Sequence, residues 1–261
     1  MPAGRHPFAS ALVTGASSGI GAEMVRLLAT DGIPVVATAR RADRLELLAG
    51  ELDGVEVLVA DLETDAGRSI VAERVADQHR PIELVVNNAG FGTSGWFDEL
   101  DPDRLAREID LNVGALTQLS HVALAAMVPR GRGWLLNVAS VAGFQPAPRL
   151  AVYAATKAYV VSLSESLHEE AKRAGVIVTA LCPGLTRTEF QQVSNTEQYQ
   201  SSMPAFAWTS VQDVARTGLA DVARGKAISV PGAVYKSVVA AASVTPRGVL
   251  RRISALVQRG V

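Results

Sequence analysis

The stretch Thr14-Gly15-Ala16-Ser17-Ser18-Gly19-Ile20-Gly21 decides the fold, because it joins a short apolar segment to a longer amphipathic one. We expect a buried strand over residues 11–15 and a helix over Gly19–Thr30. A glycine-rich turn between a strand and a helix brings backbone N–H groups toward a pyrophosphate. The glycines follow a G-x-x-x-G-x-G spacing, which differs from the general dinucleotide fingerprint G-x-G-x-x-G. The simpler alternative is a tight turn that needs glycine only for its backbone angles.

Short Val, Leu and Ile runs alternate with longer helical patterns along the rest of the chain. Several runs are almost continuously apolar, as expected of strands buried on both faces. The alternation predicts an α/β fold: a single Rossmann-type doubly wound parallel sheet of about seven strands, with helices on both faces. The further expected strands are 34–39, 55–61, 82–89, 133–140, 176–182 and 227–230, and the further expected helices are 41–51, 64–78, 103–127, 151–173 and 211–223.

The composition narrows the class of protein. A chain of 261 residues with 48% hydrophobic residues suits one α/β domain over 1–261. A net charge of -1 gives no reason to expect a nucleic-acid partner. The single cysteine, Cys182, excludes an intrachain disulfide and favours a cytoplasmic protein, and we expect it to be a small buried side chain. The four histidines lack metal-ligand spacing, so no metal is expected, and neither a targeting segment nor a membrane-spanning run is apparent.

Tyr153 and Lys157 form a Tyr-x-x-x-Lys pair in an expected helix. Residues four apart stand on one helix face, one turn from each other. An ammonium close to a phenol favours the phenolate and lowers the pKa of the tyrosine, which makes it a usable acid or base near neutral pH. The alternative is a half-buried core tyrosine with a lysine that extends past it toward solvent.

These motifs, with Ser140 upstream of Tyr153 and with Asn112, resemble the short-chain dehydrogenase/reductase family over nearly the whole chain. The resemblance implies a catalytic tetrad of Asn112, Ser140, Tyr153 and Lys157. In that family Tyr153 would exchange a proton with a carbonyl or alcohol oxygen, and Ser140 would hydrogen-bond the same oxygen. Lys157 would hold the nicotinamide ribose, and the backbone carbonyl of Asn112 would hold a water in a proton relay.

The resemblance also implies a cofactor, and the end of the second strand indicates which one. Ala39 occupies the place of the acid that binds the ribose in NAD enzymes, and Arg40 and Arg41 follow it, so we expect NADP(H). The alternative is that both arginines merely begin a solvated helix. The expected cofactor-binding residues are Gly15, Ser17, Ser18, Gly19, Ile20, Gly21, Arg40, Arg41, Asp61, Leu62, Asn88, Ala89, Gly90, Tyr153, Lys157, Pro183, Gly184, Thr186 and Thr188.

Two segments break the strand–helix rhythm. Residues 185–209 form a long polar connection that we expect to be a substrate lid. Together with 91–97 and 141–150 it would enclose an apolar substrate, unless its aromatic residues merely pack the lid. The apolar and basic tail, 233–261, could touch a membrane, cover the substrate cleft or form a subunit interface, and packing against the body is favoured. The aromatic residues gathered near the expected pocket are Phe91, Trp96, Phe97, Phe144, Phe190, Phe206 and Trp208.

The leading function is therefore hydride transfer between NADP(H) and a small-molecule carbonyl or secondary alcohol. The family resemblance further implies a homodimer or homotetramer. An NADP(H)-binding sensor without turnover is the alternative from another class, although a sensor has no need of Ser140 or Tyr153. A related enzyme that oxidises its substrate only as one step of an epimerisation or elimination is a third.

Overall fold

A computed structural model describes residues 6–197 and 203–259, and its centre is a seven-stranded parallel sheet. The strand order is β3-β2-β1-β4-β5-β6-β7. Every neighbouring pair is parallel, as the continuous apolar runs predicted. The strands are β1 (Ala11–Thr14), β2 (Val35–Ala39), β3 (Val55–Val59), β4 (Leu84–Asn87), β5 (Gly133–Val138), β6 (Val176–Leu181) and β7 (Ile228–Ser229).

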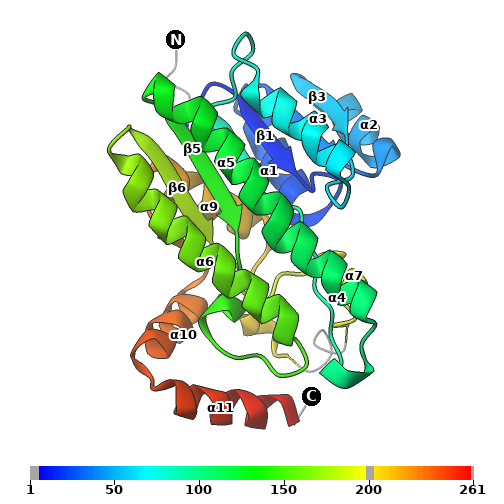
Figure 1. Ribbon diagram of the computed structural model, residues 1–261, viewed down its shortest axis with the longest axis vertical. Coiled ribbons are helices and arrows are strands. Elements are labelled where there is room, and N and C mark those ends of the chain that lie inside the picture. The colour runs from blue at the N-terminus through cyan, green and yellow to red at the C-terminus, as the bar shows by residue number, and fades with distance from the viewer. Residues whose placement is uncertain (1–5, 198–202, 260–261) are drawn as a thin grey trace.

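Helices cover both faces of this sheet, which confirms the predicted fold class (Figure 1). On one face the apolar sides of α1, α2 and α9 pack on the strands, with Met24 and Leu219 among the fully buried side chains. On the other face α3, α5 and α6 do the same, with Leu119 and Met127 buried. The bounds are α1 (Gly19–Thr30), α2 (Ala42–Glu51), α3 (Asp65–Ala76), α5 (Leu116–Met127), α6 (Ala151–Lys172) and α9 (Val211–Ala223).

The strand order reverses direction at β1, which pairs with β2 on one side and with β4 on the other. The connections from these strands therefore leave in opposite directions and open a crevice outside their carboxyl ends, where such folds bind ligands. The glycine-rich turn follows β1 at this edge, and Asn88 follows β4. The topology alone thus brings the two expected cofactor segments together.

The helix expected over 103–127 is interrupted. It consists of α4 (Pro102–Ile109), a π-helical turn (Asp110–Ala115) and α5, followed by a short 3₁₀ turn (Val128–Arg130). By length and composition this continuous helix, Pro102–Arg130, could cross a membrane, contrary to the sequence expectation that no segment would qualify. Its α5 part, however, packs against α3 and the sheet.

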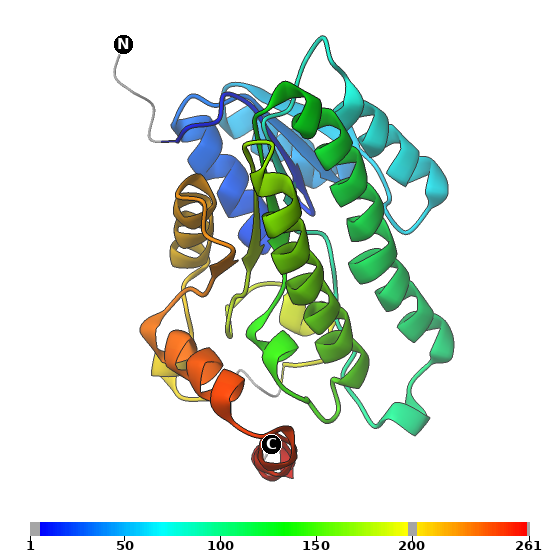
Figure 2. The same ribbon diagram turned by 60° about the vertical axis from the view of Figure 1, so that its left-hand side comes forward.

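The C-terminal tail is helical and lies beyond the carboxyl edge of the sheet. It forms α10 (Ala233–Val244) and α11 (Arg247–Arg259), and Figure 2 shows both below the ends of the strands. The lid contains α7 (Phe190–Val193) and a 3₁₀ turn (Ala205–Ala207), while its residues 198–202 lie outside the described part of the chain. Further 3₁₀ turns are Phe97–Glu99 and Val141–Phe144.

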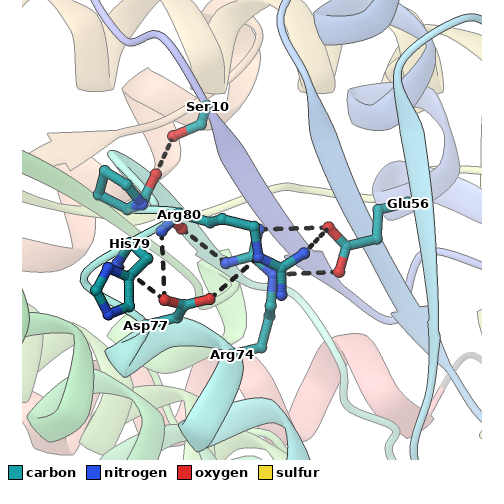
Figure 3. A network of polar contacts seen from close by, with 7 residues as sticks. Ser10, Glu56, Arg74, Asp77, His79 and Arg80 are labelled. Atoms are coloured by element: carbon teal, nitrogen blue, oxygen red, sulfur yellow. Dashed lines mark hydrogen bonds and ion pairs between the residues drawn. The ribbon is translucent and has the colours of Figure 1, made fainter.

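A polar network fastens the connection between α3 and β4 to the edge strand β3 (Figure 3). Glu56 of β3 accepts hydrogen bonds from Arg74 at 3.2 Å and from Arg80 at 3.3 Å. Arg80 also donates to Asp77 at 3.1 Å. Arg80 is mostly exposed, so its ion pairs contribute little alone, while Arg74 is largely buried, and as a network these contacts hold the loop on the sheet edge.

Candidate active site

One cleft of about 560 Å³ lies at the carboxyl edge of the sheet. Its walls come from the glycine-rich turn, the ends of β2 to β6, the start of α6, the lid and α10. Of the residues expected from sequence it is lined by Gly15, Ser17, Ser18, Gly19, Ile20, Arg40, Arg41, Asp61, Leu62, Asn88, Ala89, Gly90, Ser140, Tyr153, Lys157, Pro183, Gly184, Thr186 and Thr188. Gly21 and Asn112 do not line it, and both lie behind its wall.

The glycine-rich turn is built so that no side chain can fill it. Gly15 has a φ of +65°, and a Cβ there would lie 2.9 Å from Ala89 Cα. A Cβ on Gly21 would lie 2.5 Å from Gly15 O, so this glycine acts by packing and not by touching a ligand. Asn88 Nδ2 donates to the carbonyls of Thr14 and Gly15 at 2.9 and 3.2 Å and holds the turn against β4.

The first turn of α1 borders the cleft, because Gly19 and Ile20 line it. Ser18, the residue before the helix, makes no side-chain cap. Uncapped N–H groups and the positive end of the helix dipole suit an anion such as a pyrophosphate. The residues present therefore fit a dinucleotide.

Arg40 and Arg41 take different partners. Arg41 reaches back over the glycine-rich turn and donates to Ser17 Oγ at 2.9 Å and Ser18 Oγ at 3.0 Å. Arg40 instead pairs with Glu63 at 2.5 Å. Arg41 is thus the arginine that lies over the glycine-rich turn, while Arg40 is held by Glu63 at the border of the cleft.

A lid residue closes this end of the cleft, and sequence reasoning missed it. Glu189 accepts from Arg41 at 2.8 Å and from Arg44 at 3.0 Å. These hydrogen bonds and charges, chiefly those of Arg41, lower the pKa of the Glu189 carboxyl. An acidic residue in a polar loop carries no spacing signal, so nothing in the sequence pairs Glu189 with the arginines.

Ser140, Tyr153 and Lys157 converge at the other end of the cleft. Ser140 follows β5, and its hydroxyl lies close enough to Tyr153 to favour the phenolate form. Tyr153 and Lys157 stand one turn apart on α6, with Lys157 Nζ 5.7 Å from the centre of the tyrosine ring. The ring of Phe190 in the lid packs 5.4 Å from the Tyr153 ring and limits its access to water.

Asn112 lies in the π-helical turn behind this group. Its side chain donates to Phe91 O at 2.8 Å and to Thr156 Oγ1 at 3.2 Å, and it accepts from Phe91 N at 3.2 Å. The side chain thereby fixes the backbone that follows Asn88 to the start of α6. The π-helical turn breaks the regular hydrogen-bond ladder at this asparagine, a geometry common at functional sites.

The expected lowering of the tyrosine pKa is wrong for this structure. Burial raises the pKa of Tyr153 to about 12, and the Ser140 hydroxyl opposes this only in part. The lysine does not offset it, because Lys157 Nζ is directed to Val138 O at 2.8 Å. Burial also lowers the pKa of Lys157 to about 8, so its own charge is easily lost.

Cys182 directly follows β6 near this group and is fully buried. Burial raises the pKa of its thiol to about 12. A thiol with so little thiolate character is a poor nucleophile. The expectation of a small buried side chain is confirmed.

The substrate end of the cleft is apolar but contains fewer aromatic residues than expected. Only Phe91 and Phe190 of the predicted set line it. Trp96, Phe97 and Phe206 are mostly exposed, because they lie on the outer side of the loops. Phe144 packs in the core and Trp208 stacks with Arg187 at 5.0 Å, so neither faces the cleft.

Tyr235, from the tail, is a cleft residue that the sequence did not reveal. Its hydroxyl accepts from Leu185 N at 3.0 Å and donates to Ala207 O at 2.5 Å, so it joins both ends of the lid. Its ring covers Gly184, where a Cβ would lie 2.0 Å from Tyr235 Cε2. Of the functions considered for the tail, covering the cleft is the one that this contact fits.

A parallel sheet with a glycine-rich turn at its switch point, and a serine, tyrosine and lysine in the same crevice, defines a class of nucleotide-dependent oxidoreductases. Residues 9–199 match the model of the short chain dehydrogenase family. The chain belongs to this family, whose members bind a nicotinamide cofactor and act on small molecules.

Known relatives agree with this assignment. An uncharacterized oxidoreductase of Myxococcus xanthus is 38% identical over 193 residues, which cover 72% of this chain and 76% of the relative. A very-long-chain 3-oxoacyl-CoA reductase of Anas platyrhynchos is 34% identical, with coverage of 70% and 62%. Among solved structures, a short-chain dehydrogenase from Sphingobium yanoikuyae in complex with NADPH has a TM-score of 0.81 and 33% identity, with coverage of 89% and 92%. A bulky-bulky ketone specific alcohol dehydrogenase from Comamonas testosteroni has a TM-score of 0.77 and 30% identity, with coverage of 90% and 92%.

Proposed function

We propose that this protein transfers a hydride between NADP(H) and an apolar carbonyl or secondary alcohol, with Tyr153 as the general acid and base. The observation that carries the proposal is the position of Ser140, Tyr153 and Lys157 at one end of a cleft whose other end holds the glycine-rich turn and Arg41. An acid–base group and a phosphate site are thereby joined by one continuous space.

Each residue has a separate task in this reaction. The nicotinamide, when bound, supplies or accepts the hydride. In reduction Tyr153 gives its phenolic proton to the carbonyl oxygen, and Ser140 donates a hydrogen bond to the same oxygen as negative charge develops. The Lys157 ammonium favours transfer of the phenolic proton by stabilising the phenolate that remains. The raised pKa of Tyr153 keeps the phenol protonated at neutral pH, which suits reduction.

Preference for NADP(H) is supported by Arg41. Its guanidinium lies over the hydroxyls of Ser17 and Ser18, where it can bind a phosphate with two parallel hydrogen bonds. The similar Sphingobium structure contains NADPH, which agrees with this choice. Glu63 borders the same region, but Arg40 neutralises it.

A bulky apolar substrate is supported by the lining of the cleft. Phe91, Leu150, Phe190, Val193 and Tyr235 surround the space in front of Tyr153, with Gln145 as a polar neighbour. Such walls stabilise apolar groups by removing them from water. The names of two relatives, a reductase of very-long-chain 3-oxoacyl-CoA and a dehydrogenase of bulky-bulky ketones, point to the same kind of substrate.

The test is oxidation of NADPH, followed by its absorbance, with a panel of aldehydes, bulky ketones and 3-oxoacyl thioesters. We expect Tyr153→Phe to lower turnover by about 10²- to 10⁴-fold and to leave NADPH binding intact. Tyr159→Phe on the same helix is the matched control, because the Tyr159 hydroxyl contacts only Thr117 among the described residues. Normal turnover in Tyr153→Phe would exclude it as the proton donor. Binding of NADPH without turnover of any compound would favour the sensor.

A further inference from the structure

A buried carboxylic acid, Glu108, lies next to the proposed active site and has no task in the reaction described above. Glu108 lies in the last turn of α4, four residues before Asn112. The residue is fully buried, and neither carboxyl oxygen has a hydrogen-bond partner among the described residues. An isolated buried carboxylate is costly, so a native protein that keeps one at such a place holds it protonated, hydrated or in a functional role.

Other polar groups surround this carboxyl. Thr93 Oγ1 is also buried without a partner, and it lies near enough to favour the ionised form of Glu108 without meeting hydrogen-bond geometry. Arg104 lies one turn earlier on α4, and its Nε is likewise unpartnered. Buried polar atoms that do not reach one another directly are the usual sites of bridging water. Such water can carry a proton.

The carboxyl is electrostatically coupled to the catalytic group. The charge of Glu108 acts on both Lys157 and Tyr153 and raises the pKa of each. The three come together because α4 packs against α6. Gly90 lies between the elements: a Cβ there would lie 2.7 Å from Asn112 Oδ1 and 3.6 Å from Lys157 Nζ.

The protonation of Glu108 changes in the working range of an enzyme. Burial raises the pKa of its carboxyl to about 7, and Thr93, Arg104 and Lys157 oppose this shift. Among the described residues, Asp110 on the following turn pairs with Arg68, and the buried thiol of Cys182 is the other acidic group that acts on Tyr153 and Lys157. Glu108 therefore gives up and regains a proton near neutral pH, while ordinary surface carboxyls stay ionised there.

We propose that Glu108 is a positioning residue that stores the proton for Lys157, so that Lys157 is charged again after each turnover. The proposal rests on the proposed function. In reduction the O–H bond of Tyr153 breaks and an O–H bond forms on the substrate. Tyr153 then regains a proton from Lys157, Lys157 from the carboxyl of Glu108, and Glu108 from water. One hydride from the nicotinamide and one proton from water enter per carbonyl, and oxidation runs the sequence in reverse.

The first test needs neither cofactor nor substrate. Infrared difference spectra of the protein between about pH 5.5 and about pH 8.5 report the carbonyl band of a protonated carboxyl. We expect this band to disappear with a midpoint near pH 7 in the wild type. It should be absent in Glu108→Gln and kept in Asp103→Asn, a control that alters an exposed acid of the same helix. A midpoint near 4, or the same band in Glu108→Gln, would overturn the proposal.

The second test measures turnover. Glu108→Gln should bind NADPH normally but turn over about tenfold more slowly, less than the loss of a direct proton donor. The part of its pH profile with a midpoint near 7 should vanish, and Glu108→Asp should restore both rate and profile in part. A merely structural role predicts a loss of stability and of NADPH binding with an unchanged profile, and that result would overturn the proposal.

The outcomes also separate the two proposals. If the wild type is active and Glu108→Gln has the same turnover and pH profile, the role of Glu108 as a proton store is wrong, while the proposed reductase activity stands. A wild type that turns over no carbonyl or alcohol would overturn the reductase, and with it this role of Glu108, whatever the infrared spectra show.

Discussion

At the scale of single residues, the site depends on how burial changes the protonation of a few side chains. Tyr153 and Lys157 respond in opposite directions, because burial disfavours the charged form of each. Burial keeps the Tyr153 phenol protonated and makes the Lys157 ammonium easier to deprotonate. The two directions of the reaction should therefore depend differently on pH.

Initial rates of alcohol oxidation should rise from about pH 7 to about pH 10, because oxidation needs the Tyr153 phenolate and its pKa is raised to about 12. Reduction uses the protonated phenol, which persists over this range. It should fall in two steps, near pH 7 as Glu108 loses its proton and above pH 8 as Lys157 loses its charge, because their pKa values are about 7 and about 8. The dependence of kcat/KM on pH, measured in both directions, tests these two expectations. Identical pH profiles for oxidation and reduction would contradict the role of Tyr153 as the acid and base.

The two arginines should contribute unequally to cofactor choice. Arg41→Ala removes a guanidinium from above Ser17 and Ser18 and should weaken NADPH binding about 10- to 100-fold, the worth of a charge-assisted hydrogen bond. Arg40→Ala should cost less, because Arg40 is paired with Glu63. NADH binding should change little in either variant. Fluorescence titrations with both cofactors measure this.

Arg26→Ala is the control for this pair, since Arg26 contacts only Glu51 on the outer side of α1 among the described residues. Equal losses of NADPH and NADH affinity in Arg41→Ala would show that Arg41 does not bind the phosphate that distinguishes the two cofactors.

At the scale of elements, the tail and the lid are joined through one side chain. The Tyr235 hydroxyl of α10 holds Leu185 at the start of the lid and Ala207 near its end. A change in this hydroxyl should therefore act on substrate binding more than on the proton transfer.

Tyr235→Phe should raise KM several-fold with kcat nearly unchanged, and should lower the free energy of unfolding by about 1 kcal/mol for the lost hydrogen bonds. Tyr159→Phe serves again as the control, because it loses a hydroxyl on the exposed side of α6. Steady-state kinetics and thermal unfolding measure the two effects. A fall in kcat with an unchanged KM would place Tyr235 outside the lid.

How much the sequence predicts also differs between elements. The strands and most helices follow from periodicity, because a buried parallel strand needs an unbroken apolar run. The glycine-rich turn and the Tyr-x-x-x-Lys pair were likewise recognisable, since their spacing carries the geometry. Glu189, Tyr235 and Glu108 were not, because each meets its partner only through tertiary packing. The pKa of Tyr153 was misjudged because spacing reports the lysine but not the burial.

At the scale of the whole molecule, the sheet presents its ligand-binding edge to the tail. The helices α10 and α11 lie beyond the carboxyl ends of the strands (Figure 1). Of the side chains described in these two helices, Tyr235 of α10 alone lines the cleft, while Leu250 of α11 is buried. The two helices should therefore differ in importance.

A chain cut after Thr245 keeps α10 and should retain most of its activity. A chain cut after Gly232 loses Tyr235 and should show a raised KM together with binding of a dye that detects exposed apolar surface, because the cleft wall and the cover over Gly184 are removed. Kinetics and dye fluorescence of the two truncated proteins check this. Full activity of the shorter one would show that the tail is dispensable for the cleft.

The π-helical turn at Asp110–Ala115 has a consequence for insertions and deletions. Such a turn contains one more residue than an α-helical turn, and each α-helical residue rotates the chain by about 100°. Deleting one residue here would restore a regular helix and keep α5 nearly in phase, whereas the same deletion within α5 would rotate the rest of that helix by about 100° and carry its apolar side away from the sheet. A one-residue deletion in this turn should therefore keep the packing of α5 but change the position of Asn112, so aligned relatives that lack the extra residue should have their gap in this turn and not within α5.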